Sequence, residues 1–300
     1  MNRSARYLKQ RNFMSNITVL GTGAMGSRMA KVLLDAGHKI TVWNRNHKRT
    51  AALVHAGARS ATSPRAAVES ADFAISMVRD NEASRDVWLD AEAGALAGLP
   101  ESAIAIESST LTPEWICRLN EHFLQKNASF LDAPVVGTRP QAEAAQLIYV
   151  VGGNEDTFAR AEPILMAMGN IVHHVGPAGS GAAVKLMINA LFGIQVAAMA
   201  ELIALIENYG FDKDNAIGAI SSTPVCSPAA KVAAGAMAAR KFAPLFPIEL
   251  VEKDFNYALQ MATSSSSHVP VIEAVQAIFE KAGVQGYGDD NITGVVQSYL

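Results

Sequence analysis

Up to residue 176, short runs of β-branched and aliphatic residues alternate with longer stretches in which apolar residues recur every three or four positions. The short runs predict strands at Ile17–Leu20, Lys39–Trp43, Asp72–Val78, Ala103–Ile106, Ser129–Val135, Leu147–Val151 and Ile171–Val175. The longer stretches predict helices at Ala24–Ala36, His47–Ala56, Glu114–Leu124 and Asp156–Met168. Such alternation is typical of a largely parallel, doubly wound sheet with helices on both faces, so an α/β domain is expected over residues 15–176.

Gly176-Pro177 ends this alternation, and no strand pattern follows. Helical spacing then predicts helices at Ala178–Glu207, Asn215–Ile220, Ala229–Ala238, Ile248–Ala262, Pro270–Ala282 and Ile292–Tyr299. The sequence therefore predicts a second, all-helical domain over residues 177–300. Residues 1–13 are basic and contain no apolar run that a signal peptide requires, so residues 1–14 are expected to form a flexible extension.

Composition narrows the class of protein. Half of the residues are hydrophobic and 18% are charged, which excludes a disordered chain. The 25 basic and 28 acidic residues give a net charge of −3, so no nucleic-acid partner is expected. The apolar run Leu186–Ala200 contains polar residues and is shorter than a membrane span, so no membrane partner is expected. Two cysteines and unclustered histidines predict a reducing, cytoplasmic location and no metal site.

A glycine-rich turn follows the first predicted strand. Ile17–Leu20 leads directly into Gly21-Thr22-Gly23-Ala24-Met25-Gly26, which opens a helical pattern. Gly21 permits a tight turn, Gly23 lets a pyrophosphate approach the backbone, and Gly26 allows close packing of helix on strand. Because the helix N-terminus adds unpaired N–H groups and a positive dipole end, this context predicts a dinucleotide-binding turn.

The end of the second predicted strand distinguishes the two nicotinamide cofactors. Enzymes that use NAD usually place an acidic residue there to bind the ribose hydroxyls, but this chain has Asn44 and Arg45. Lys48 and Arg49 follow within the same short segment. A guanidinium can bind the 2′-phosphate of NADP through two hydrogen bonds, so NADP(H) is the expected cofactor and NAD the alternative. Ordinary surface cations are the competing interpretation.

One lysine lies near the start of the most apolar predicted helix. Lys185 and Asn189 are four residues apart and therefore share one helix face. If Lys185 lines a cleft, desolvation lowers its pKa toward the range that an acid–base catalyst needs. The alternative is a side chain whose ammonium group reaches out to solvent.

Together the motifs resemble those of the β-hydroxyacid dehydrogenase family, the 3-hydroxyisobutyrate dehydrogenase-like enzymes. The matching segments, in order along nearly the whole chain, are Gly21–Gly26, Ser109-Thr110, Asp132–Val135 with Gly137, Gly179–Gly181 with Lys185 and Asn189, and Lys253-Asp254. The pair Asn44-Arg45 is most similar to the NADPH-dependent glyoxylate/succinic semialdehyde reductase branch.

The resemblance implies reversible hydride transfer between NADP(H) and a small aldehyde, keto acid or 3-hydroxy acid. Lys185 would be the general acid and base, and Asn189 would orient substrate or lysine. The implied cofactor-binding residues are Gly21, Gly23, Ala24, Met25, Gly26, Asn44, Arg45, Met77, Val78, Thr110 and Lys253. The implied substrate-binding residues are Ser109, Val136, Gly137 and Thr138. A homodimer formed through the helical domain is also implied.

Two positions depart from the family pattern. Val136 stands where the family typically has a serine, and Thr138 where many members have glycine. Valine cannot donate a hydrogen bond to substrate, so a less polar carbonyl or an imine is an alternative substrate class. Imine reductases resemble this family but generally replace the lysine that is present here as Lys185. A non-catalytic NADP-binding regulator is the alternative from a different class.

Overall fold

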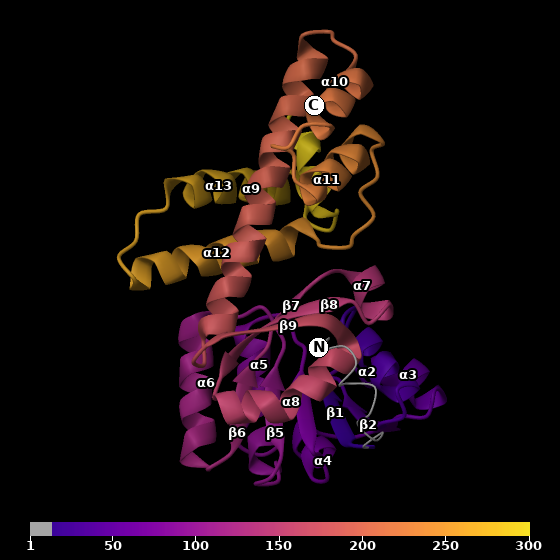
Figure 1. Cartoon of the computed structure of the whole chain (residues 1–300), viewed down its shortest axis with the longest axis vertical. Helices are drawn as coiled ribbons and strands as arrows, with labels where there is room; N and C mark the ends of the chain where they lie inside the picture. The colour runs from indigo at the N-terminus through magenta and orange to yellow at the C-terminus, as the bar shows by residue number, and fades with distance from the viewer. Residues whose placement is uncertain (1–13) are drawn as a thin grey trace, which may run out of the picture. The chain divides into compact units, whose positions relative to one another are not determined.

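A computed structural model describes residues 14–300, so residues 1–13 of the expected extension lie outside the described part of the chain. The chain divides into two compact units after Ala182, inside helix α9 (Ser180–Asn208), shown in Figure 1. The sequence placed the domain boundary at residue 177. The helix α9 therefore begins within the first unit and continues as the first element of the second.

The first unit is built on one sheet in the order β3-β2-β1-β4-β5-β6-β8-β7, with β9 paired to β8. The strands are β1 (Asn16–Leu20), β2 (Lys39–Trp43), β3 (Arg59–Ser60), β4 (Phe73–Ser76), β5 (Ile104–Glu107), β6 (Ser129–Asp132), β7 (Val135–Val136), β8 (Leu147–Gly153) and β9 (Gly169–Gly176). From β3 through β2, β1, β4 and β5 to β6, each strand is parallel to its neighbour. Strand β8 runs antiparallel to β6 and β7. The structure confirms the predicted class, an α/β Rossmann-like domain followed by a helical domain.

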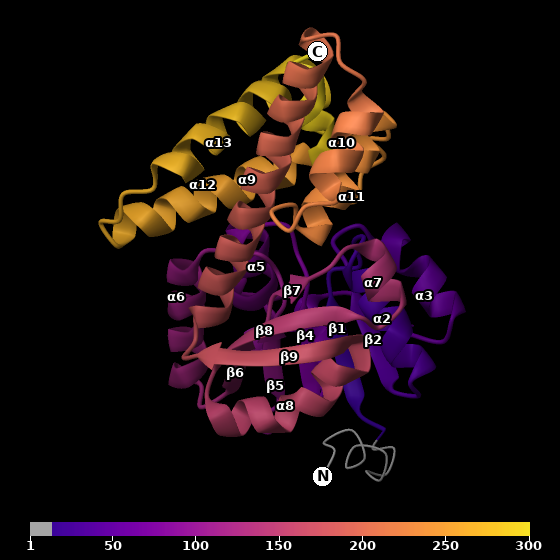
Figure 2. The ribbon, with the colours of Figure 1, turned by 45° about the horizontal axis from the view of Figure 1, so that its top comes forward.

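Helices cover both faces of this sheet (Figure 2). One face packs against α2 (Gly26–Asp35), α3 (Ala51–His55) and α8 (Glu155–Met168). The other packs against α4 (Pro64–Val68), α5 (Asn81–Leu89) and α6 (Pro113–Gln125). The remaining short elements are η1 (His47–Thr50), η2 (Ala95–Ala97) and α7 (Arg139–Glu143). Both faces are apolar because alternate strand residues point to opposite sides, and each side buries its own set of aliphatic residues.

The second unit is helical, as predicted. It contains most of α9, followed by α10 (Lys213–Ser221), α11 (Pro228–Ala238), α12 (Ile248–Ser264), α13 (Pro270–Ala282), a π-helical turn (Gly283–Tyr287) and a 3₁₀ helix (Ile292–Ser298). Helices α12 and α13 lie side by side in Figures 1 and 2. Helix α9 packs closely on α12, because Gly193 leaves room for the ring of Phe255.

By length and composition, α9 could cross a membrane, and half of its most apolar window is buried inside the structure. The most apolar window of α9 has 18 residues and is longer than the apolar run Leu186–Ala200 on which the sequence prediction was based. Core helices of proteins that never enter a membrane have the same composition, so α9 does not identify a membrane span.

The carboxylate of Asp132 holds the beginning of α9. Asp132 ends β6 and is fully buried, and it accepts hydrogen bonds from the backbone N–H of Gly179 (3.0 Å) and Ala182 (2.8 Å). Burial raises the pKa of Asp132, and these backbone donors oppose that rise. Glycine is required at positions 152 and 181, because a side chain there would overlap Asp132. A Cβ on Gly181 would lie 2.8 Å from the Oδ2 atom of Asp132. The acid therefore caps α9 from inside the sheet domain.

We expect Asp132→Ala to lower the free energy of unfolding by about 3 kcal/mol, because buried helix-terminal N–H groups lose a charged acceptor. Urea denaturation monitored by circular dichroism measures this change. Asp35→Ala is the control, since Asp35 pairs with Lys31 on the exposed side of α2 and should matter little. Equal effects of the two substitutions would contradict the capping role.

Candidate active site

The glycine-rich turn joins β1 to α2 as predicted, and two of its glycines are required by packing. Gly21 has a φ of +97°, and a Cβ there would overlap the carbonyl oxygen of Met77. A Cβ on Gly26 would overlap the carbonyl oxygen of Gly21. These two positions therefore bring the start of α2 close to the carboxyl ends of β1 and β4.

Gly23 has no such packing role. No atom lies within 4 Å of the position that its Cβ would occupy. Helix α2 begins after Met25, and no side chain among residues 14–300 caps it. An open backbone at Gly23, beside Ala24 and an uncapped N-terminus, fits the pyrophosphate of a dinucleotide, which binds N–H groups directly.

The segment after β2 presents cations around a structural asparagine. Asn44 Oδ1 accepts a hydrogen bond from Thr22 N at 3.0 Å, so this side chain shapes the glycine turn itself. Arg45, Lys48 and Arg49 are exposed, and none of them forms an ion pair within the described part of the chain. Three guanidinium and ammonium groups beside the turn can accommodate a phosphate on the adenosine ribose.

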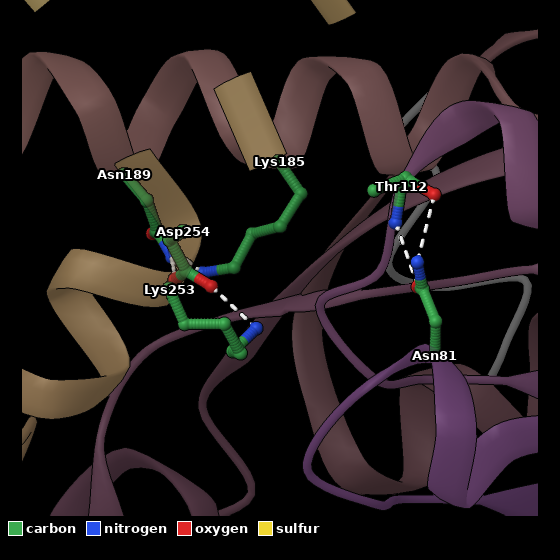
Figure 3. Close-up of polar contacts among 6 residues, drawn as sticks. All are labelled: Asn81, Thr112, Lys185, Asn189, Lys253 and Asp254. Carbon is green, nitrogen blue, oxygen red and sulfur yellow. Dashed lines mark hydrogen bonds and ion pairs between the residues drawn. The ribbon is translucent and has the colours of Figure 1, made fainter. Parts of the chain in front are cut away.

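The loops after β4 and β5 lie along the same edge of the sheet and are bonded to each other. Val78 N donates to Ser109 Oγ at 2.8 Å. Asn81 and Thr112 form two hydrogen bonds: Asn81 Nδ2 donates to Thr112 Oγ1 at 3.0 Å, and the backbone N–H of Thr112 donates to Asn81 Oδ1 at 3.1 Å (Figure 3). The structure thus brings Met77, Val78, Ser109 and Thr110 together, but the hydroxyl of Ser109 is buried and bonded within the protein.

The residues implied to bind substrate follow β6 and β7. Val136 is half-buried, and Gly137 is exposed. The backbone N–H and the hydroxyl of Thr138 both donate to Gln141 Oε1, at 2.9 and 2.8 Å, at the start of α7. The next residue, Arg139, was not identified from the sequence; its Nε is buried and has no hydrogen-bond partner among residues 14–300. This turn therefore carries an apolar side chain and a cation.

In the second unit, four side chains from α9 and α12 form a continuous polar chain (Figure 3). Lys185 Nζ donates to Asn189 Oδ1 at 2.8 Å, and Asn189 Nδ2 donates to Asp254 Oδ2 at 2.6 Å. Lys253 Nζ donates to the other oxygen of Asp254 at 2.7 Å. Lys185, Asn189 and Asp254 are 7%, 8% and 4% exposed, so the chain lies in an otherwise apolar unit. The predicted pair Lys185 and Asn189 is thus extended by Asp254, which the sequence indicated only as part of the Lys253-Asp254 motif.

Burial lowers the pKa of Lys185 to about 8. Two charges modify this effect: the carboxylate of Asp254 raises the pKa, and the ammonium of Lys253 lowers it. A lysine that titrates near pH 8 can both donate and accept a proton under ordinary conditions. Asn189 orients the ammonium of Lys185 by accepting its hydrogen bond. The Nζ atom of Lys253 lies 4.4 Å from the ring centre of Tyr257. The arrangement is therefore suited to proton transfer.

The sequence did not reveal the role of Asp254, because the partner of this side chain is distant along the chain. Asn189 and Asp254 are 65 residues apart and meet only when α12 packs on α9. Within residues 14–300, no cluster of three or more His, Cys, Asp or Glu side chains could hold a metal ion. The dinucleotide-binding sheet and the buried lysine define the class as a two-domain Rossmann-type oxidoreductase.

Comparisons with known proteins give the same class. A family model described as the NAD binding domain of 6-phosphogluconate dehydrogenase matches residues 16–176, and one described as NAD-binding of NADP-dependent 3-hydroxyisobutyrate dehydrogenase matches residues 179–299. The chain therefore belongs to the β-hydroxyacid dehydrogenase family of the 3-hydroxyisobutyrate dehydrogenase type, which binds NAD(P).

Individual relatives match over most of their length. Glyoxylate/succinic semialdehyde reductase 2, chloroplastic, of Arabidopsis thaliana is 30% identical over 94% of this chain and 79% of its own. A 3-hydroxyisobutyrate dehydrogenase of Pseudomonas aeruginosa is 33% identical over 89% of this chain and 91% of its own. The structure of Mycobacterium tuberculosis 3-hydroxyisobutyrate dehydrogenase with L-serine superposes with a TM-score of 0.88 at 27% identity, over 95% of this chain and 99% of that one.

The two charges beside Lys185 generate a paired prediction about its pKa. Asp254→Asn should move the pKa of Lys185 below about 8, because the carboxylate that favours the ammonium is lost. Lys253→Met should move it above that value, because a like charge is removed. NMR titration of ¹³C-labelled lysine measures both, with the resonance assigned by its loss in Lys185→Arg. Asp35→Asn serves as the control, and shifts of the same sign in both site variants would contradict the assignment.

Proposed function

We propose that this protein is an NADP(H)-dependent reductase of small aldehydes or keto acids that acts reversibly on the corresponding hydroxy acids. The observation that carries the proposal is the buried, hydrogen-bonded Lys185, whose pKa is lowered to about 8. Bound nicotinamide cofactor supplies or takes up the hydride. The proton comes from the protein, and its burial, hydrogen bond and lowered pKa support Lys185 as the source.

In the direction of reduction, the ammonium of Lys185 donates its proton to the carbonyl oxygen of the substrate. Its positive charge also stabilises the negative charge that develops on that oxygen. In the direction of oxidation, the neutral amine accepts the hydroxyl proton. Asn189 keeps the amine in one orientation, and Asp254 holds Asn189 through a 2.6 Å hydrogen bond.

The cations after β2 support NADP(H) over NAD(H). Arg45 is exposed beside the glycine turn, and no acid occupies the position that would bind a free ribose 2′-hydroxyl. Asn44 supports the same assignment, because its side chain is bonded to the turn at Thr22 and supplies no carboxylate.

The turn after β7 bears on the choice of substrate. Val136 offers an apolar surface, whereas Arg139 adds a cation that forms no ion pair with residues 14–300. A cation favours an anionic substrate group, which agrees with an acid-bearing aldehyde. The curated relatives named above are reductases and dehydrogenases of such compounds.

We propose that the active form is a homodimer. Tyr209 is exposed directly after helix α9, and the helix itself exposes Met187, Leu191, Leu202 and Leu205. These positions fall on one side of the helix, given its 3.6-residue period. A continuous apolar stripe of this kind on a soluble helix favours burial against another chain, and a second copy of this chain would cover it.

Lys185→Ala should lower kcat by about 10²- to 10⁴-fold, because the proton donor is lost, while NADPH binding stays near wild type. Absorbance at 340 nm measures NADPH oxidation with glyoxylate, succinic semialdehyde, an uncharged aldehyde and a cyclic imine. In the wild type, kcat for reduction should fall as pH rises through about 8, and kcat for oxidation should rise over the same range.

Lys231→Ala is the control, because Lys231 is exposed on α11. An unchanged kcat in Lys185→Ala would remove this lysine from the mechanism. Turnover of the imine alone would favour an imine reductase, and NADPH binding without turnover in either direction would favour a regulator.

Arg45→Ala should weaken NADPH binding by about tenfold and leave NADH binding nearly unchanged, since only NADPH carries the phosphate that the guanidinium contacts. Fluorescence titration measures both dissociation constants. Arg118→Ala, an exposed substitution on α6, is the matched control. Equal losses for the two cofactors would refute the 2′-phosphate assignment.

A further inference from the structure

A second buried carboxylate lies in the sheet domain, and the proton-transfer chemistry does not use it. Glu107 ends β5 and is fully buried. Its Oε2 atom accepts hydrogen bonds from Ser84 Oγ (2.7 Å) and Trp88 Nε1 (2.9 Å), and its Oε1 atom accepts one from Ser109 N (3.1 Å). It forms no ion pair with any residue between 14 and 300.

The hydrogen bonds around Glu107 all have its carboxylate as the acceptor. Trp115 Nε1 donates to Ser84 Oγ at 3.0 Å, so the hydroxyl proton of Ser84 is directed to the carboxylate. Val78 N donates to Ser109 Oγ at 2.8 Å, and the hydroxyl of Ser109 in turn hydrogen-bonds the carboxylate. Every neighbour therefore donates to Glu107, and an amide in its place would put an NH₂ group against a donor.

This network joins the loop after β4 to the loop after β5. The loop after β4 is tied through Val78 to Ser109, and the loop after β5 is tied through Ser109 to Glu107. The two hydrogen bonds between Asn81 and Thr112 close the far end of the pair. The two loops are therefore held as one layer at the carboxyl edge of β4 and β5.

Strand order places this layer relative to a bound dinucleotide. The order β3-β2-β1-β4-β5-β6 has its switch point between β1 and β4, and a dinucleotide binds across that crevice. The adenosine half lies toward β2, where Arg45 follows the strand, and the nicotinamide half lies toward β4 and β5. The loops tied by Glu107 are on the nicotinamide side.

A buried, unpaired charge costs stability that an apolar residue would not. Such networks hold a single conformation when every member is satisfied. The stability lost by burying the charge of Glu107 is accounted for if binding of the dinucleotide requires the two loops in this conformation.

We propose that Glu107 is a positioning residue for the nicotinamide half of the cofactor, acting through Ser109 and Val78 on the loops that this half contacts. The inference rests on the proposed function, because it assumes a nicotinamide dinucleotide in the crevice. It differs from a role in general stability, because it predicts an effect on one half of the ligand and none on the other.

The test compares a complete cofactor with its adenosine half. Binding of NADPH and of 2′,5′-ADP to the full chain is measured by isothermal titration calorimetry, with NADH and ADP in parallel. Glu107→Gln should weaken the complete cofactor by about tenfold, because one buried donor is left facing the new NH₂ group, while 2′,5′-ADP stays within about twofold of wild type. Glu121→Gln makes the same chemical change at an exposed site on α6 and should alter neither.

Ser84→Ala is a milder second variant in case Glu107→Gln does not fold. It removes one donor, keeps the carboxylate and should weaken NADPH by a smaller factor with the same selectivity. Equal loss of both ligands would show general damage and overturn the inference, as would unchanged NADPH binding in both variants. Failure of the wild type to bind any of the four ligands would refute the proposed function itself.

Discussion

The buried carboxylate of Asp132 is the interaction on which the site depends most. It ends β6, caps the N-terminus of α9 and leaves room for no side chain at Gly152 or Gly181. The helix that it caps carries Lys185 less than one turn after the last capped N–H group, at Ala182. One acid thereby connects the end of the sheet with the start of the helix that bears Lys185. Hydrogen bonds from helix N–H groups offset the cost of burying its charge.

The pKa of Lys185 is set by two opposing electrostatic effects, burial and a nearby carboxylate. Desolvation favours the neutral amine, and the negative charge of Asp254 favours the ammonium, while Asn189 is hydrogen-bonded to both side chains. Direct contact with the carboxylate would hold the proton too firmly for transfer at neutral pH. An intervening amide keeps the attraction weaker while fixing the geometry, which accounts for an asparagine between two charged groups.

Periodicity predicted the sheet, its helices and the helical second unit because those elements repeat long enough to show a pattern. It missed β3 and β7, which have two residues each, and α5, whose buried face includes Ser84 beside Val87 and Trp88. The candidate residues were predicted from local motifs, and the structure brings them to one sheet edge or to one helix pair. Spacing along the chain did not reveal the roles of three residues. The partners of Asp254 and Glu107 come from distant parts of the chain, and Arg139 is notable because its buried Nε has no hydrogen-bond partner among residues 14–300.

Two kinds of residue lie at the carboxyl edge of the sheet in the first unit. Asp132 and Glu107 are buried acids that form no ion pair with any residue between 14 and 300. Asp132 accepts hydrogen bonds from backbone N–H groups, and Glu107 accepts them from N–H and O–H groups, each at the end of a strand. Changing either disturbs several hydrogen bonds at once. Val136 ends β7 and Arg139 begins α7, and the turn between them is held by the hydrogen bonds of Thr138 to Gln141 and not by these two side chains. Because these two side chains do not hold the turn, the carboxyl edge of the sheet depends on the two buried acids, which order the backbone at the ends of β5 and β6.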